Sequence, residues 1–283
     1  MQTENNPSYV FLPDGERISA FGLGTWHMGE RADARRAEVE ALRTGIELGL
    51  NVIDTAEMYA SGGAEEVVAE AVRGRRDDVF IVSKVMPQNA SRKGTIAACE
   101  KSLRRLSTDR IDLYLLHWRG SHPLAETVAA LASLRQAGKI RHWGVSNFDV
   151  ADMEELDAID GGKACAANQV LYHLGERGIE FDLLPLLQRR SVPVMAYCPL
   201  GQGELADHAL LAELGRAHGV SAATIAIAFL LTKPGVQPIP KTARAERVRE
   251  LARAREIVLS PDDLARLDRA FPPPRQKRPL AMT

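Results

Sequence analysis

The chain has 283 residues, of which 45% are hydrophobic and 26% are charged, and its formal net charge is −1. This balance excludes the strongly basic surface typical of nucleic-acid-binding proteins, so we expect no nucleic-acid partner. The length is sufficient for one large core. Strand and helix patterns alternate without a Ser/Gly-rich linker, so we predict a single domain over residues 1–283.

Cysteine content and apolar runs indicate the compartment. Cys99, Cys165 and Cys198 are widely spaced and form no CxxC motif, which predicts free thiols in a reducing environment. The first residues are polar and lack the basic and apolar regions of a signal peptide. The longest apolar run, residues 225–231, is far too short to span a bilayer. We therefore expect a cytoplasmic protein without a membrane partner.

In chain order, the first predicted element is a hairpin at residues 9–18, within an N-terminal segment 1–19, that turns at Pro13-Asp14-Gly15. Short β-rich runs then alternate with helical patterns whose apolar residues recur every three or four positions. The β-rich runs predict eight strands, at residues 20–25, 51–54, 79–84, 111–117, 140–146, 166–170, 192–197 and 236–240. The helical patterns include residues 34–48, 64–73, 95–106, 124–137 and 221–230.

The C-terminal part adds two features. Ser260-Pro261-Asp262-Asp263 predicts the start of an extra helix, because it combines an N-cap serine, a proline at the first helical position and acidic residues in the first turn. Residues 271–283 follow as a tail with three consecutive prolines, which we expect to be extended.

Eight strand–helix repeats in this length predict a (β/α)8 TIM barrel, preceded by the hairpin and followed by the extra helix. A doubly wound parallel sheet is the alternative. That fold would require a G-x-G-x-x-G motif opening a helix. The run Phe21-Gly22-Leu23-Gly24-Thr25-Trp26 has only two of those glycines and no helical pattern directly after it, so the barrel is favoured.

Four titratable residues lie at or just beyond the ends of predicted strands: Asp54, Tyr59, Lys84 and His117. Each alone has an ordinary structural explanation. In a parallel barrel, however, these strand ends converge on one mouth. A lysine beside a tyrosine would lower the phenol pKa from about 10, and an aspartate would hold the ammonium in place. The set predicts a proton-transfer site, and it contains no metal-ligand cluster, so we expect no metal.

The motifs around these residues resemble those of the aldo-keto reductase family over nearly the whole chain. They are Gly22-Leu23-Gly24-Thr25-Trp26, Ile53-Asp54-Thr55-Ala56 with Tyr59, Ser83-Lys84, Leu116-His117-Trp118, Gly144-Val145-Ser146-Asn147-Phe148, Asn168-Gln169, Ala196-Tyr197-Cys198-Pro199-Leu200-Gly201 and Ile239-Pro240-Lys241-Thr242. Residues 54–60 and 116–121 look most like small bacterial methylglyoxal-reductase-type members. Ala60 departs from the glycine that many members have after the tyrosine.

The resemblance implies a reaction and roles for the four residues. It implies NADPH-dependent reduction of small aldehydes and ketones to alcohols by hydride transfer. Tyr59 would be the general acid in reduction and the general base in alcohol oxidation. Lys84 and Asp54 would tune Tyr59, and His117 would orient the carbonyl group.

The resemblance also implies that NADP(H) lies across the barrel mouth without a Rossmann fold. Ser146, Asn147 and Gln169 would hold the nicotinamide carboxamide, and Tyr197 would stack on the ring. The alternative for Asn147 is a turn cap, and for Gln169 a buried strand amide. Further cofactor contacts are expected from Gly24, Thr25, Trp26, Asp54, Cys198, Pro199, Leu200, Gln202, Glu204 and Glu250.

The adenosine end of the cofactor falls on an arginine-rich stretch. By the resemblance, Lys241, Thr242 and Arg247 would bind a phosphate, which favours NADPH over NADH. The alternative is a helix face with solvated arginines. Glu204 is expected to pair with Lys241 over the pyrophosphate, and its loss would then speed NADPH release. Leu251 stands where the family commonly has an asparagine against the adenine.

The predicted substrate pocket consists of Trp26, Tyr59, His117 and Trp118. Large aromatic side chains at a mouth suit a small carbonyl compound with an apolar face. Methylglyoxal and aryl aldehydes both fit this description, and the sequence does not choose between them. Nor does it say whether the tail covers the mouth. Small members of the family are commonly monomers, so the resemblance implies that this protein is a monomer.

Two other functions are compatible with the same scaffold. One is a cofactor-sensing regulatory protein with little turnover. The other is a lyase or hydrolase that works through Lys84. A Schiff-base lysine must be neutral, whereas Asp54 would hold Lys84 in its charged form, which disfavours the second alternative.

Overall fold

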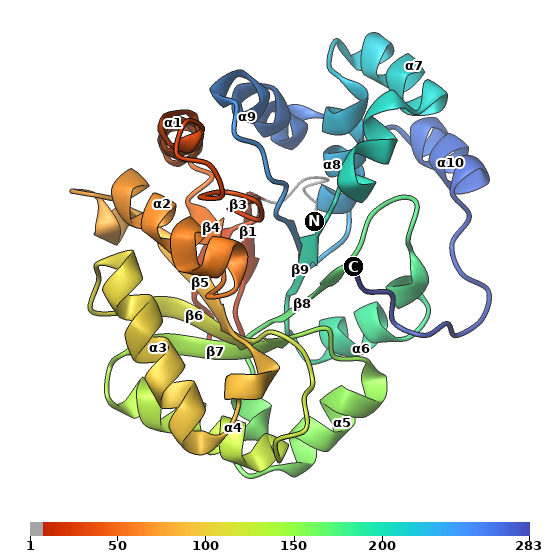
Figure 1. Ribbon diagram of the computed structural model, residues 1–283. Helices are drawn as coiled ribbons and strands as arrows, with labels where there is room; N and C mark the ends of the chain where they lie inside the picture. Colours follow the sequence, from red (N-terminus) through yellow and green to blue (C-terminus); the bar gives the residue numbers. More distant parts are fainter. Residues whose placement is uncertain (1–7) are drawn as a thin grey trace.

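The computed structural model describes residues 8–283, which form a barrel of eight parallel strands surrounded by helices (Figure 1). Each strand pairs with its neighbour along the chain from β3 to β10. The strands are β3 (Gly22–Gly24), β4 (Val52–Asp54), β5 (Phe80–Val85), β6 (Ile111–Leu116), β7 (Ile140–Ser146), β8 (Asn168–Leu171), β9 (Val194–Tyr197) and β10 (Val236–Pro238). The Gly24 N–H donates to Pro240 O at 2.9 Å, which brings the first and last strands together. The predicted (β/α)8 fold is confirmed.

Helices cover the outside of the barrel (Figure 1). They are α1 (Arg35–Glu47), α2 (Gly63–Ala71), α3 (Arg92–Leu106), α4 (Leu124–Gln136), α5 (Val150–Ala158), α6 (Leu183–Arg189), α7 (Ala209–His218), α8 (Ala222–Leu231), α9 (Ala245–Ala252) and α10 (Pro261–Ala270). The last is the predicted extra helix. Ser260 caps it in a reciprocal capping box with Asp263, as its sequence pattern indicates.

Apolar side chains fill the space between barrel and helices. Every residue of β5 and β6 is buried, as expected for parallel strands covered on both faces. Every residue of α8 except Ala223 is buried as well. Among the described residues, no single helix is long and apolar enough to cross a membrane. Only α7 and α8 together reach that length and composition, and they are bent by 85°.

The N-terminal hairpin packs against the ends where the strands begin. β1 (Tyr9–Phe11) pairs antiparallel with β2 (Arg17–Ser19), which confirms the predicted hairpin. Residues 1–7 of the predicted segment 1–19 lie outside the described part of the chain. Val10, Leu12 and Ile18 are buried in the core. The hairpin therefore adds apolar surface to the end of the barrel opposite the predicted site.

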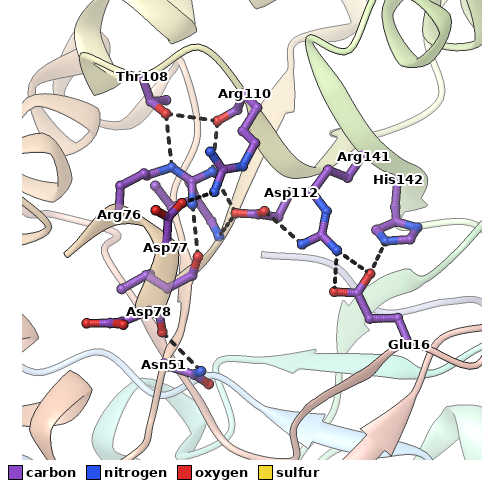
Figure 2. A network of polar contacts seen from close by, with 12 residues as sticks. Glu16, Asn51, Arg76, Asp77, Asp78, Thr108, Arg110, Asp112, Arg141 and His142 are labelled. Carbon is purple, nitrogen blue, oxygen red and sulfur yellow. Dashed lines mark hydrogen bonds and ion pairs between the residues drawn. The ribbon is translucent and has the colours of Figure 1, made fainter.

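A network of ion pairs at this same end connects strand starts to the hairpin (Figure 2). At its centre is Asp112 of β6, which is 1% exposed. Its carboxylate accepts from Arg76 Nη2 at 2.7 Å, from the Ile81 N–H at 2.8 Å and from Arg141 Nη1 at 3.2 Å. Arg141 also pairs with Glu16 of the hairpin at 2.7 Å. Ion pairs, as well as apolar packing, therefore hold the starts of the strands in place.

Candidate active site

A cavity of about 740 Å³ opens at the ends where the strands terminate. Asp54 is the last residue of β4, Lys84 lies near the end of β5, and His117 directly follows β6. Tyr59 begins the 3-10 turn η1 (Tyr59–Gly62), which precedes α2. Asp54, Tyr59 and His117 line the cavity, and Lys84 is fully buried behind them. The fold therefore brings together the four residues predicted from strand ends.

The Lys84 ammonium joins the other groups. Its Nζ donates to Asp54 Oδ2 at 2.7 Å, to the Thr55 backbone oxygen at 2.9 Å and to Tyr59 Oη at 3.2 Å. Burial lowers the pKa of Lys84, and the charge of Asp54 opposes that fall. Three acceptors match the three N–H bonds of an ammonium group, so the contacts hold Lys84 in its charged form.

The pKa of Tyr59 shifts in the direction opposite to our prediction. Burial raises it well above its usual range, and the negative charge of Asp54 raises it further. We expected Lys84 to lower it. That prediction is wrong for this structure, because loss of solvent around the phenol outweighs the nearby cation. Tyr59 is thus a protonated phenol at neutral pH, which is the state required of a proton donor.

His117 is neutral in this environment. It is 8% exposed, and burial together with the charge of Lys84 lowers its pKa from 6.5 to about 2. Its ring lies edge-on to that of Tyr59, with centroids 5.9 Å apart. Nδ1 is buried and accepts or donates no hydrogen bond among the residues of the described chain. A neutral imidazole carries one N–H, which can be donated to an oxygen atom in the cavity.

This pKa predicts a nuclear magnetic resonance result. A group with a folded-state pKa of about 2 stays unprotonated throughout the range in which an ordinary histidine titrates. We expect the ring proton shifts of His117, assigned by comparison with His117→Asn, to stay constant as the pH falls from about 8 to about 5.5. A titration with a midpoint near the ordinary histidine value would contradict the burial argument.

The residues expected to hold the nicotinamide form a continuous polar chain. Gln169 Nε2 donates to Asp54 Oδ1 at 2.7 Å, and Ser146 Oγ donates to the Gln169 backbone oxygen at 2.9 Å. Asn147 Nδ2 donates to the His117 backbone oxygen at 3.1 Å, while its Oδ1 accepts from Tyr197 Oη at 2.9 Å. Apart from Asp54 and His117, these residues come from β8 and from the ends of β7 and β9, and the two amides line the same cavity as Asp54, Tyr59 and His117.

Most of the other predicted cofactor contacts line the same cavity. They are Gly24, Trp26, Cys198, Pro199, Leu200, Gln202, Lys241, Thr242, Arg247 and Glu250. Thr25 does not: it is fully buried, and its hydroxyl donates to the Asp54 backbone oxygen at 2.9 Å. Glu204 is exposed and does not line the cavity, and within residues 8–283 it forms no ion pair with Lys241. The contacts of Thr25 and Glu204 with a bound cofactor stay predictions.

The C-terminal tail reaches the cavity. The sequence did not show whether it would do so. Arg177 Nη1 donates to the Phe271 backbone oxygen at 2.6 Å, and Lys277 lies 3.6 Å from Asp182. From there the tail returns to the barrel mouth (Figure 1), where Met282 and Thr283 line the cavity. Burial raises the pKa of Tyr197 to about 12, against hydrogen bonding from Thr283.

Several further lining residues were not predicted. They are His27, Met58, Gly203, Ala206, Ser221, Ala223, Ile239, Pro240, Leu251, Met282 and Thr283. Pro240 adjoins a predicted contact, and the resemblance already placed Leu251 at the adenine position, so the sequence held a usable signal for both. Ser221 and Ala223 start a buried helix, and Met282 belongs to a docked tail. Nothing local in the sequence marks those three.

Comparison with known proteins gives consistent matches. The model of the Aldo/keto reductase family matches residues 20–271. The chain is 55% identical over 270 residues to methylglyoxal reductase YeaE of Escherichia coli K12, covering 94% of this chain and 95% of that protein. It is 34% identical over 259 residues to glyoxal reductase of Bacillus subtilis 168, covering 92% and 91% of the two chains.

Solved structures agree with these matches. A crystal structure of an aldo/keto reductase from Klebsiella pneumoniae in complex with NADP and acetate superposes with a TM-score of 0.95 at 53% identity. The match covers 98% of this chain and 99% of that one. A thermostable aldo-keto reductase, Tm1743, in complex with the inhibitor epalrestat superposes with a TM-score of 0.86 at 41% identity, covering 92% and 98%.

Proposed function

The chain belongs to the aldo/keto reductase family, and on that premise we propose that it reduces small aldehydes and ketones, methylglyoxal among them, to alcohols with NADPH. The observation that carries this proposal is the hydrogen bond from Lys84 Nζ to Tyr59 Oη at 3.2 Å, at the wall of a cavity large enough for cofactor and substrate. The relatives described above support the cofactor and the substrate class.

The residues account for the proton that the reaction consumes. Lys84 donates to the Tyr59 oxygen, so the phenol's own O–H is free to point into the cavity. Tyr59 would give that proton to the carbonyl oxygen as the carbon is reduced, and the resulting phenolate would be stabilised by the adjacent ammonium. The neutral His117 would donate its N–H to the same oxygen and fix the direction of approach. NADPH, when bound, supplies the hydride that the carbonyl carbon takes up.

The cavity fits an extended dinucleotide. At one end, Tyr197 and the amides of Asn147 and Gln169 offer a ring face and carboxamide partners. At the other end, Lys241 and Arg247 are exposed cations beside the Thr242 hydroxyl, the combination that binds a phosphate monoester. We propose that these three residues select NADPH over NADH.

Replacing Arg247 with alanine tests this selection. We expect the Kd for NADPH to rise about 10- to 100-fold, because one charge-assisted contact to phosphate is lost. The Kd for NADH should stay nearly constant, since NADH lacks that phosphate. Arg249→Ala is the matched control, because Arg249 is exposed on the same helix and does not line the cavity. Fluorescence titration measures all four values, and equal losses for both cofactors would refute a phosphate contact.

Loss of NADPH absorbance with a panel of small aldehydes tests the reaction itself. We expect turnover with methylglyoxal and with aryl aldehydes, and their ranking would identify the preferred class. Binding of NADPH without turnover of any aldehyde would favour the regulatory alternative. The monomeric state and the cytoplasmic location expected from the sequence are also part of this proposal. The three free cysteines support the location.

A further inference from the structure

A fully buried carboxylate, Glu65, lies outside the proton-transfer site and has no role in the chemistry described so far. It belongs to the first turn of α2, directly after the turn that carries Tyr59. Its Oε2 lies 2.6 Å from Arg105 Nε of α3, and its Oε1 accepts from Ser83 Oγ of β5 at 2.6 Å. A buried ion is tolerated only when it is paired and hydrogen-bonded in this way.

Ser83 connects Glu65 to the strand that carries the catalytic lysine. Successive side chains of a strand point to opposite faces. Lys84 therefore extends into the barrel, towards Asp54 and Tyr59, while Ser83 extends outward to meet Glu65. The hydrogen bond at Ser83 links α2 to β5 at the position next to Lys84.

Arg105 connects Glu65 to the turn that carries the tyrosine. Ala60 and Ser61 both have left-handed backbone angles, with φ of 49° and 52°, which non-glycine residues adopt at a cost. Gly62 follows with φ of 96°, and a Cβ there would lie 2.4 Å from Cδ and Nε of Arg105. The guanidinium thus packs directly on this strained turn, and Glu65 and Ser102 hold it there.

We propose that Glu65 is a positioning residue: through Arg105 and Ser83 it fixes the turn that carries Tyr59 relative to the strand that carries Lys84. The distance that matters is the 3.2 Å between Lys84 Nζ and Tyr59 Oη. If the turn relaxes, this contact lengthens and proton transfer slows, while substrate and cofactor still bind. The inference rests on the proposed reductase function.

Glu65→Gln removes the charge and keeps the size of the side chain. With methylglyoxal and NADPH we expect kcat to fall about 10- to 100-fold, with KM for methylglyoxal and Kd for NADPH within about twofold of wild type. Arg105→Met should give the same split, because it loses the ion pair from the other side. The control is Glu70→Gln on the same helix, since Glu70 pairs with Arg35 at the surface and should leave kcat unchanged.

A role confined to stability predicts a different result. In that case the variants would unfold at lower temperature, but their folded fraction would keep the kcat of wild type, and this would overturn the proposal. If a single variant fails to fold, the double variant Glu65→Gln/Arg105→Met takes its place, because it leaves no unpaired buried charge. A lowered kcat in the double variant supports the proposal, and a wild-type kcat overturns it. Absence of turnover in the wild type would instead count against the reductase function on which the inference rests.

Discussion

Replacing Tyr59 with phenylalanine is expected to lower kcat/KM for carbonyl reduction by about 10²- to 10⁴-fold, the usual contribution of a positioned general acid. The substitution removes one oxygen atom. The Lys84 ammonium donates a hydrogen bond to this oxygen at 3.2 Å, so the substitution removes that contact as well. The ring remains, so its packing beside His117 is kept. Binding of NADPH should change little.

Steady-state kinetics and a fluorescence titration of NADPH measure the two effects separately. Tyr9→Phe is the matched control, because Tyr9 is a half-exposed tyrosine on the hairpin at the opposite end of the barrel. If Tyr59→Phe retained more than about a tenth of the wild-type kcat/KM, another group would be supplying the proton, and the assignment of Tyr59 would be wrong.

Replacing Asp112 with alanine is expected to reduce the free energy of unfolding by about 3–5 kcal/mol, because it leaves the largely buried Arg76 guanidinium without its ion-pair partner and the buried Ile81 N–H without an acceptor. Asp112 is 1% exposed and accepts from Arg76, Arg141 and the Ile81 backbone. A single substitution would therefore remove a partner from Arg76 and Arg141 (Figure 2) and from the Ile81 N–H. The network lies at the end of the barrel away from the cavity, so kcat of the folded fraction should be unchanged.

Urea unfolding measures this loss of stability. The control is Asp77→Ala, which removes a carboxylate from the same network (Figure 2), but one whose side chain is 88% exposed. Solvent screens an ion pair at so exposed a carboxylate, so that variant should unfold almost as the wild type does. Similar midpoints for Asp112→Ala and Asp77→Ala would show that burial does not set the strength of this network.

The parts of the fold and site that the sequence predicted depend on local patterns. The eight strands could be placed because β-rich runs recur between amphipathic helices, and their predicted ends differ from the observed ones by a few residues at most. Asp54, Lys84 and His117 could be grouped because each lies near the end of such a run. In a parallel barrel, strand topology alone then brings them to one mouth.

The features that the sequence predicted wrongly or did not reveal depend on contacts between segments that are distant along the chain. Glu65 occurs in an ordinary amphipathic helix, and only its pairing with Arg105, forty positions along the chain, makes it a buried ion. Met282 reaches the cavity because Arg177 and Asp182 anchor the tail far from its end. The direction of the Tyr59 pKa depends on the degree of burial, which residue types and their spacing do not give.

We propose that this chain transfers hydride from NADPH to a carbonyl carbon while Tyr59 protonates the oxygen. A single-turnover experiment tests this proposal. The wild-type protein and a stoichiometric amount of NADPH are mixed with methylglyoxal, and the product is identified by nuclear magnetic resonance. We expect one molecule of alcohol for each NADPH oxidised by the wild type, and almost no alcohol over the same time with Tyr59→Phe. Bound NADPH that stays reduced in the wild type, or equal product yields from both proteins, would contradict it.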